Sequence, residues 1–414
     1  MRPTTLQLFV AVCALGLFGV LYMGGPSLFS VEYTAGSGDQ TAAAENATNP
    51  SATPPADIVT HLPTPEAVKA IYMSQCVAGT KNFREELVRI ADTTEINSII
   101  IDIKDYSGRI SFFPQSAALQ DVVSDACRAP DMKEFIADLH RRGIYVIGRI
   151  TVFQDPYMTK NHPDRAVKSK STGGVWKDHK GLSFIDVGSR DHWDYIVELS
   201  KEAHAIGFDE LNYDYIRYPS DGNMKDTLYS LSDTDNKPEM LKKFFAYLHE
   251  KVKPTGAVLS ADLFGMTTTN RDDLNIGQVL ENALPYFDYI APMVYPSHYP
   301  KGFHNFDDPN KHVYEVIHYS MGTAVERVKE FYKLVPPELA SVSTSTPPFD
   351  PPAPEVVAKH INQLRPWLQD FDYGGNYDIA EVQAQIKATY DVGLTSWMLW
   401  APSNKYTVGA LKSQ

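Results

Sequence analysis

Eight short runs of β-branched and aromatic residues alternate with helical stretches along most of this chain. Strand followed by helix, repeated many times, is typical of a parallel α/β fold. Eight repeats over about 350 residues predict a (β/α)8 barrel, the TIM barrel, with a few long loops. The predicted strands are 70–77, 98–105, 145–153, 209–218, 257–265, 289–296, 364–371 and 395–402, and the helical segments include 83–94, 131–143, 193–207, 240–252 and 379–393.

A doubly wound open sheet is the alternative architecture for such a pattern. No GxGxxG motif follows the first predicted strand. That absence disfavours the dinucleotide-binding version of the open sheet. The sequence therefore predicts a barrel, and it predicts no cofactor.

The N-terminus carries an uncharged apolar run of 18 residues from Leu6 to Met23, preceded by Arg2. No Lys or Arg occurs between Gly24 and Val68, so the positive side lies N-terminal to the run. We therefore expect residues 1–30 to form an uncleaved transmembrane signal anchor, with the C-terminal bulk of the chain outside the cytoplasm. Removal of the segment as a signal peptide, followed by secretion, is the alternative.

Residues 31–65 are rich in Pro, Ala and Thr and predict a disordered linker, so that the folded domain spans 66–414. The net charge of −13 disfavours nucleic acid as a partner, because phosphates would be repelled. Three cysteines are present, Cys13, Cys76 and Cys127. Cys76 and Cys127 could form a disulfide outside the cytoplasm or remain buried thiols, and the sequence leaves both open.

The stretch FDELNYDYIRYP at 208–219 is unusually polar for a buried parallel strand, which should be a nearly continuous apolar run. Side chains alternate between the two faces of a strand. Leu211, Tyr213 and Tyr215 share one parity, and we expect this apolar set to face the helices. The other parity, Glu210, Asn212, Asp214 and Ile216, should then face the barrel lumen.

The same parity test on the other strands predicts a polar lumen. Most of these positions lie toward the C-terminal ends of their strands, which carry the active site in this fold. A purely structural ion-pair network is the alternative interpretation, because buried charges must pair whatever their role. The predicted lumen residues are Asp102, Lys104, Arg149, Asn212, Asp214, Asp262, Tyr295, Gln369 and Trp400.

Two of these carboxylates, Asp214 and Asp262, end adjacent predicted strands. Paired carboxylates beside aromatic platforms are the equipment of glycoside hydrolysis, in which one group stays protonated and the other is ionised. A neighbouring arginine, Arg149 or Arg217, would favour the ionised form of Asp214, which we assign as the nucleophile. Asp262 has apolar sequence neighbours and is assigned as the acid/base. The reverse assignment, and a retaining or an inverting course, stay open.

Two predicted loops, 153–163 and 296–310, are rich in Tyr, His, Asp and Asn and suit the recognition of hydroxyl groups. No metal site is predicted, because His298, His304, Asp307 and Asp308 show no HxH or HExxH spacing. No GxSxG elbow occurs either. The predicted substrate-binding residues are Asp102, Lys104, Arg149, Asn212, Tyr295, His298, Trp367, Gln369 and Trp400.

Seven motifs in order carry a family resemblance over residues 66–410. They are IDIKDYSGRI, GRITVFQDP, FDELNYDYIRYPSD, SADLFG, APMVYPSHY, RPWLQDF and SWMLWAPSN. The chain resembles a (β/α)8-barrel family first defined as a domain of unknown function and regarded as glycoside hydrolases. It is more distantly similar to α-amylase-type glycosidases, which place an Asp nucleophile after strand four and a carboxylic acid after strand five. Asp214 and Asp262 match those positions, although the amylase pattern has Glu at the second.

These features lead us to expect an enzyme that cleaves an extracytoplasmic polysaccharide or oligosaccharide. Two other classes compete with this expectation. A non-catalytic carbohydrate-binding barrel would keep Tyr295, Trp367 and Trp400 as stacking platforms. A structural envelope protein would use the polar lumen only as an ion-pair network. The sequence does not fix the sugar, the linkage, endo or exo cleavage, or the oligomeric state.

Overall fold

The computed structural model describes residues 59–232, 236–334 and 352–414, which belong to one compact unit, Val59–Gln414. The predicted signal anchor and residues 31–58 of the predicted linker lie outside the described residues. Within the described part, no helix has the length and apolar character needed to cross a bilayer.

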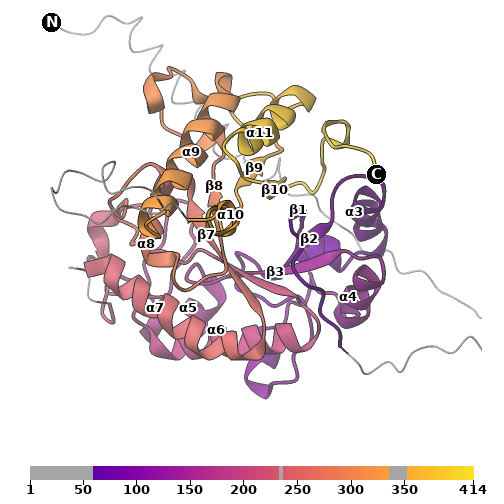
Figure 1. The fold of residues 1–414 in the computed structure, drawn as a ribbon. Helices are drawn as coiled ribbons and strands as arrows, with labels where there is room; N and C mark the ends of the chain where they lie inside the picture. The colour runs from indigo at the N-terminus through magenta and orange to yellow at the C-terminus, as the bar shows by residue number, and fades with distance from the viewer. Residues whose placement is uncertain (1–58, 233–235, 335–351) are drawn as a thin grey trace, which may run out of the picture. The chain divides into compact units, whose positions relative to one another are not determined.

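The strands form a closed, all-parallel barrel in which neighbours in sequence are neighbours in space, and β1 pairs with β10 to close the ring (Figure 1). All eight predicted strands are present, which confirms the (β/α)8 TIM barrel. The barrel strands are β1 (Lys69–Met73), β2 (Ser98–Lys104), β3 (Tyr145–Thr151), β5 (Glu210–Asp214), β7 (Val258–Phe264), β8 (Tyr289–Met293), β9 (Trp367–Gln369) and β10 (Trp397–Trp400).

Helices surround the strands, and a small antiparallel pair, β4 (Lys168–Ser169) with β6 (Thr227–Leu228), is added in the loops. The five helical segments named from the sequence all correspond to helices, whereas the longest, α9, was not among them. The helices are α2 (Gln75–Ala78), α3 (Lys81–Thr93), α4 (Met132–Arg141), α5 (Pro156–Asn161), α6 (Arg190–Ala205), α7 (Lys237–Val252), α8 (Leu280–Ala283), α9 (Val313–Phe331), α10 (Pro354–Ile361) and α11 (Ile379–Asp391).

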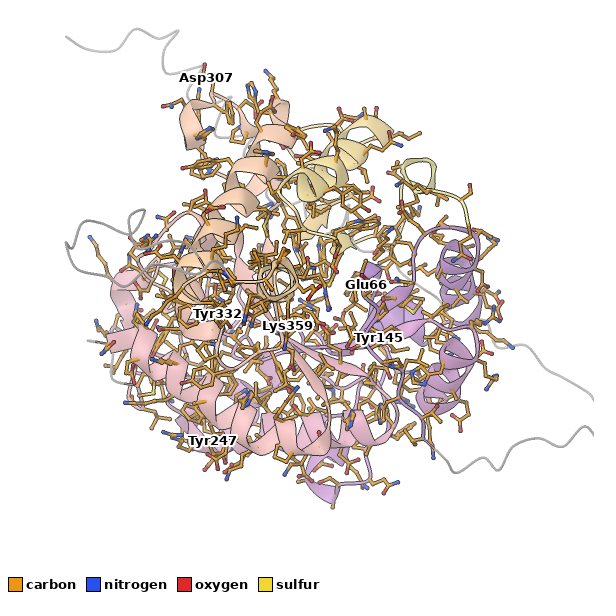
Figure 2. The ribbon with its side chains drawn as sticks, in the orientation of Figure 1. Glu66, Tyr145, Tyr247, Asp307, Tyr332 and Lys359 are labelled. Atoms are coloured by element: carbon orange, nitrogen blue, oxygen red, sulfur yellow. A yellow bond between two sulfur atoms is a disulfide. The ribbon has the colours of Figure 1, made fainter. Side chains whose placement is uncertain are left out.

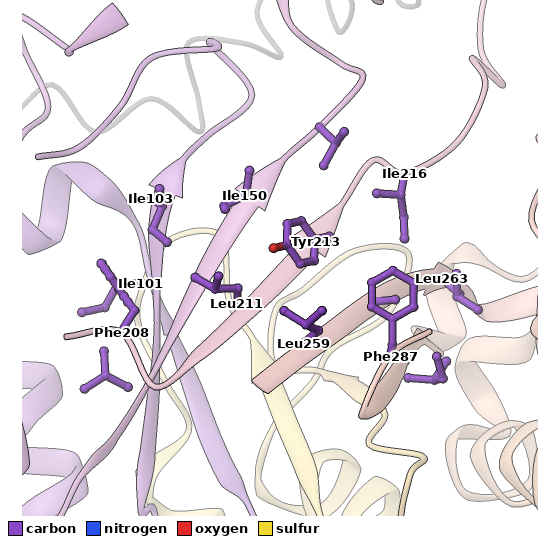
Figure 3. Close-up of a cluster of buried hydrophobic side chains, with 14 of the residues drawn as sticks. Ile101, Ile103, Ile150, Phe208, Leu211, Tyr213, Ile216, Leu259, Leu263 and Phe287 are labelled. Atoms are coloured by element: carbon purple, nitrogen blue, oxygen red, sulfur yellow. The ribbon is translucent and has the colours of Figure 1, made fainter. Parts of the chain in front are cut away.

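The main hydrophobic core lies between the strands and the helices, where the outward parity of each strand packs (Figure 3). Leu211 and Tyr213 face this core, as predicted. Ile216 joins them instead of facing the lumen, because β5 ends at Asp214 and Tyr215 takes a left-handed backbone conformation, with φ of 51°. The parity prediction is therefore wrong for Tyr215 and Ile216.

A buried ion pair fills the lumen at the N-terminal ends of the strands. The Arg365 guanidinium lies 2.9 Å from a Glu210 carboxylate oxygen and stacks over the ring of Tyr289 at 3.8 Å. Tyr145, among the strands in Figure 2, donates its hydroxyl hydrogen to Glu210 over 3.2 Å. Glu210 thus has a structural role at the closed end of the barrel, because removing either partner would leave a buried charge.

Residues 59–65, which the sequence places in a linker, pack across this closed end. The Leu62 backbone N–H donates to Asp209 Oδ1 over 2.7 Å, and the Thr64 hydroxyl lies 3.0 Å from the hydroxyl of Tyr145. His140 Nε2 lies 2.9 Å from the other Asp209 oxygen. Residues 59–65 therefore lie at the N-terminal ends of the barrel strands.

A disulfide joins Cys76 of α2 to Cys127 in the loop before α4, with Cα atoms 4.3 Å apart. Of the two states that the sequence left open, the bonded one is present. The bond closes a loop over a sequence separation of 51 residues. Cross-linking a loop of this size restricts the unfolded chain and so stabilises the fold.

We expect the double substitution Cys76→Ser with Cys127→Ser to lower the free energy of unfolding by about 2–4 kcal/mol. Urea unfolding of the full-length chain, followed by tryptophan fluorescence, measures this loss. The unsubstituted chain in reducing agent should match the double variant. Equal stability of the oxidised parent and the double variant would contradict a stabilising bond.

Candidate active site

A cavity of about 280 Å³ opens at the C-terminal ends of the barrel strands. Its wall contains both candidate catalytic carboxylates and a set of aromatic and cationic side chains. The lining residues are Arg149, Asp214, Tyr215, Arg217, Asp262, Phe264, Gly265, Met266, Met293, Tyr295, His298, Tyr299, Trp367 and Trp400.

Arg149 of β3 lies at the centre of the charged groups. Its Nη1 donates to Asp102 Oδ1 over 2.7 Å, and its Nη2 and Nε donate to Asp214 Oδ2 over 2.5 and 3.1 Å. The side chain of Tyr72 donates to the other Asp102 oxygen over 2.5 Å. Burial raises the pKa of Asp102 to about 6, even though Arg149 favours its charged form. Asp102 thus anchors Arg149 from behind the pocket wall.

Asp214 is surrounded by hydrogen-bond donors. Besides the two bonds from Arg149 to Oδ2, its Oδ1 accepts the backbone N–H of Tyr215 over 2.6 Å. An ionised carboxylate only accepts hydrogen bonds, so three N–H donors suit the charged form of Asp214.

Asp262 of β7 has a different environment. Burial, together with the nearby charge of Asp214, holds the pKa of Asp262 well above its usual range, against the opposing effect of Arg149. Its Oδ1 accepts from Asn212 Nδ2 over 2.9 Å and from Trp367 Nε1 over 2.7 Å. Because Oδ1 already accepts from these two donors, Oδ2 is the oxygen that can carry a proton when Asp262 is neutral.

The two carboxylates lie close together, because one nitrogen contacts both. Arg149 Nε is 3.1 Å from Asp214 Oδ2 and 3.9 Å from Asp262 Oδ2. These two oxygens are therefore separated by no more than the sum of the two distances, 7.0 Å.

Aromatic rings form one side of the pocket. The ring of Trp400 lies 4.1 Å from that of Tyr72 and meets Trp367 edge-on at 5.5 Å. The Arg149 guanidinium carbon lies 5.1 Å from the centre of Trp400. Tyr295 and His298, whose ring centres are 5.4 Å apart, continue this wall.

Lys104 does not join the site, contrary to the parity prediction. The pairing of β2 with β3 is irregular after Asp102, where Lys104 faces Ile150. The fully buried ammonium group instead lies 2.8 Å from Asp155 and 5.9 Å from the ring of Tyr195 on α6. The bulge therefore turns Lys104 to the helix side of the barrel.

Gln369 and Asn212 face the lumen but lie behind the pocket wall. Gln369 Oε1 accepts from Ser297 Oγ over 2.8 Å, and Ser297 Oγ lies 2.9 Å from His298 Nδ1. Asn212 Nδ2 bonds both Asp262 and Ser260. These amides orient the side chains of Asp262 and His298 rather than lining the cavity.

The sequence analysis missed several lining residues. Tyr215 was expected to face the helices, and Arg217 was considered only as a neighbour of Asp214. Phe264 and Met266 were read as apolar surroundings of Asp262. Tyr215 and Arg217 line the pocket because the strand ends at Asp214. The sequence pattern contains no mark of that end.

Within the described part of the chain, no group of three or more His, Cys, Asp or Glu side chains is arranged to hold a metal ion. His298 and His304 belong instead to aromatic contacts: His298 lies beside Tyr373, and His304 stacks on Tyr319 at 3.9 Å.

A family model described as "Putative glycosyl hydrolase domain" matches residues 70–347 and 352–406. The chain belongs to this family. The resemblance that the seven motifs carry is thereby confirmed. No curated protein matches the chain.

Two solved structures illustrate what the chain is similar to. The glycoside hydrolase domain of PgaB (BpsB) from Bordetella bronchiseptica is 14% identical, with 82% of this chain and 95% of that chain covered and a TM-score of 0.54. A hypothetical protein from Ruminiclostridium thermocellum ATCC 27405 is 31% identical, with 50% of this chain and 98% of that chain covered and a TM-score of 0.42.

Proposed function

We propose that this protein is a glycoside hydrolase that cleaves O-glycosidic bonds of an extracytoplasmic polysaccharide, with Asp214 as nucleophile and Asp262 as acid/base. One observation carries the proposal. Two carboxylates line a single pocket in opposite environments: Asp214 is held by Arg149, and Asp262 is buried, with its pKa raised well above the usual range. Glycoside hydrolysis requires that division of protonation states.

In the first step, the Asp262 proton passes to the glycosidic oxygen while Asp214 attacks the anomeric carbon, so that the leaving alcohol departs and a glycosyl ester forms. In the second step, Asp262, now ionised, removes a proton from a water molecule that attacks the same carbon and releases Asp214. The upper bound of 7.0 Å on the oxygen separation favours this retaining course, because inverting enzymes need about 6.5–9.5 Å.

The other wall residues have supporting roles in this proposal. Trp367, Trp400 and Tyr295 provide ring faces for stacking against a sugar, and His298 offers a polar contact. Arg149 holds Asp214 in its ionised form and in a fixed orientation. Asp102, Asn212 and Gln369 hold these groups in place from behind.

Incubation of the full-length chain with a panel of bacterial envelope and plant polysaccharides tests the proposal through the release of reducing ends. We expect turnover of at least one member, with the anomeric configuration retained in the first product seen by NMR. Binding of a glycan without turnover of any member would favour the non-catalytic carbohydrate-binding barrel, for which the aromatic wall is equally suited.

An extracytoplasmic location, with the N-terminal segment as a membrane anchor, is part of the same proposal. The Cys76–Cys127 disulfide supports it, because such bonds persist in oxidising compartments. Acid trapping of cells followed by thiol labelling measures the state of the two cysteines, and reduced thiols in the native host would count against this location.

Trp367→Phe is expected to move the basic limb of the pH–kcat/KM profile to higher pH. The change removes an N–H donor that stabilises the ionised form of Asp262 but keeps an aromatic ring. The pKa of Asp262 therefore rises further, and the acid stays protonated over a wider range. Trp400→Phe, which removes no hydrogen bond to Asp262, is the control and should leave the limb in place. A shift to lower pH in Trp367→Phe would contradict the assignment.

A further inference from the structure

Arg217 lines the pocket without a carboxylate partner. Its Nη1 donates to the Tyr218 carbonyl oxygen and to Ser220 Oγ, each over 3.1 Å. Its Nε and Nη2 donate to no group in the described part of the chain, and no carboxylate there forms an ion pair with it. One edge of this guanidinium is therefore available to a molecule in the pocket.

The surroundings of Arg217 make its charge costly. The guanidinium carbon lies 4.9 Å from the ring centre of Tyr215 and 5.2 Å from that of Phe264. Burial lowers the pKa of Arg217, against the opposing effect of Tyr215 and of more distant carboxylates such as Asp214. Stacking on aromatic rings offsets part of the cost, but a cation removed from water is stabilised mainly by an opposite charge.

Buried arginines elsewhere in the barrel pair with carboxylates, whereas Arg217 is half-buried in the pocket wall. Arg149 pairs with two carboxylates, Arg365 with Glu210, and Arg327 with Glu281, where its Nε lies 2.8 Å from the carboxylate. Arg217 lines the pocket as Arg149 does, but it differs from all three in lacking a carboxylate partner within the described residues.

The backbone is strained in the turn that places Arg217. Tyr215 has φ of 51°, in the left-handed region, which is unfavourable for a residue that carries a side chain. The turn brings the Tyr215 ring beneath the guanidinium of Arg217 and both into the pocket wall. Such strain persists where the surrounding structure enforces it, and it concentrates at ligand-binding sites.

We infer that Arg217 binds an anionic substituent of the sugar at the cleavage site, so that the substrate is an acidic glycan. The inference rests on the proposed function and names its substrate class. A guanidinium edge with two free donors matches the two oxygens of a uronate carboxylate or of a phosphate or sulfate ester. The protein as a whole carries a net charge of −13, so this attraction must be local rather than long-range.

Matched pairs of glycans that differ only in the acidic group test the inference on the full-length chain. They are a polyuronate and its carboxyl-reduced form, a sulfated glycan and its desulfated form, and a phosphorylated glycan and its dephosphorylated form. We expect kcat/KM to favour one acidic member over its neutral partner by about 10- to 150-fold. The pair that shows the preference identifies the source of the anion.

Arg217→Gln should lower kcat/KM much more for the acidic member than for its neutral partner, so that the preference is abolished. Arg217→Lys, which keeps the charge but not the planar fork, should retain part of it. Arg141→Gln, on the exposed surface of α4, controls for the loss of one positive charge and should leave the preference unchanged.

Equal losses on both members of a pair in Arg217→Gln would overturn the inference. Cleavage of neutral glycans alone by the parent would also overturn it, while the glycosidase proposal would stand. If the parent cleaves none of these glycans, calorimetry of their binding to the full-length chain tests the inference instead. Selective binding of an acidic member that Arg217→Gln removes would support the anion site without catalysis, and absence of such binding would overturn it.

Discussion

Asp262→Asn is expected to lower kcat/KM on natural polysaccharides by about 10²–10⁴-fold, the usual contribution of a general acid. Asn can still accept the hydrogen bonds that Asp262 Oδ1 receives from Asn212 and Trp367, so the fold should persist. What is lost is the proton on Oδ2. Initial rates of the full-length chain and the variant measure the effect, with thermal unfolding as the check on folding.

The leaving group gives this prediction a sharper form. An aryl glycoside with a strongly acidic phenol departs without protonation, so Asp262→Asn should lose much less kcat/KM on that substrate than on a polysaccharide. The basic limb of the pH profile should disappear as well, because it reports loss of the raised-pKa proton of Asp262. An equal loss on both substrates would contradict the role of Asp262 as the acid.

Asp214→Ala is expected to lower kcat by at least about 10⁴-fold, because no covalent intermediate can form. The cavity left by the carboxylate lies beside Arg149, which would keep its bond to Asp102 and its longer contact with Asp262. A small anion such as azide should bind there and restore turnover of an aryl glycoside. Since azide attacks once from the side of Asp214, the glycosyl azide should have the opposite anomeric configuration to the substrate.

Asp214→Asn is the matched control for this rescue. It keeps the shape of the side chain, leaves no space for azide, and should stay inactive in its presence. A glycosyl azide of retained configuration, or loss of less than about tenfold in Asp214→Ala, would exclude Asp214 as the nucleophile. An inverted first product from the unsubstituted chain would instead make Asp214 a general base.

The barrel could be predicted because its signal is repeated eight times and does not depend on any one residue. Parity along the strands also placed Arg149, Asp214 and Asp262 on one axis, since their strands are regular up to those positions. Closure of the sheet then brings these three side chains together, and the number of predicted strands indicates that the sheet closes.

The errors arose where the backbone departs from regular strand geometry. At Lys104 a bulge shifts the register, which reverses the direction of a side chain and replaces a predicted lumen charge with a pair to Asp155. At Tyr215, a non-glycine residue adopts the left-handed backbone conformation, which ends the alternation of side chains between the two faces of the strand. Neither deviation has a signature in the local residue types, and the position of Arg217 depends on the second.

Other features of the site depend on contacts between strands that are far apart in sequence. The indole N–H of Trp367 reaches Asp262 across 105 residues, and Gln369 reaches Ser297 across 72. Trp367 was predicted as a stacking platform, and its hydrogen bond to Asp262 could not be read from its own strand. The role of a lumen residue therefore depends on contacts with residues of other strands, which only the closed sheet brings near it.

Residues 59–64 cover the N-terminal end of the barrel, so a polysaccharide can reach the pocket only from the C-terminal end. Leu62 and Thr64 are fixed to Asp209 and Tyr145 at the starts of the strands, whereas the pocket opens where the strands finish. A long glycan that lies over the open rim would thus not meet residues 59–64. Segment 59–64 and the pocket therefore occupy opposite ends of the barrel.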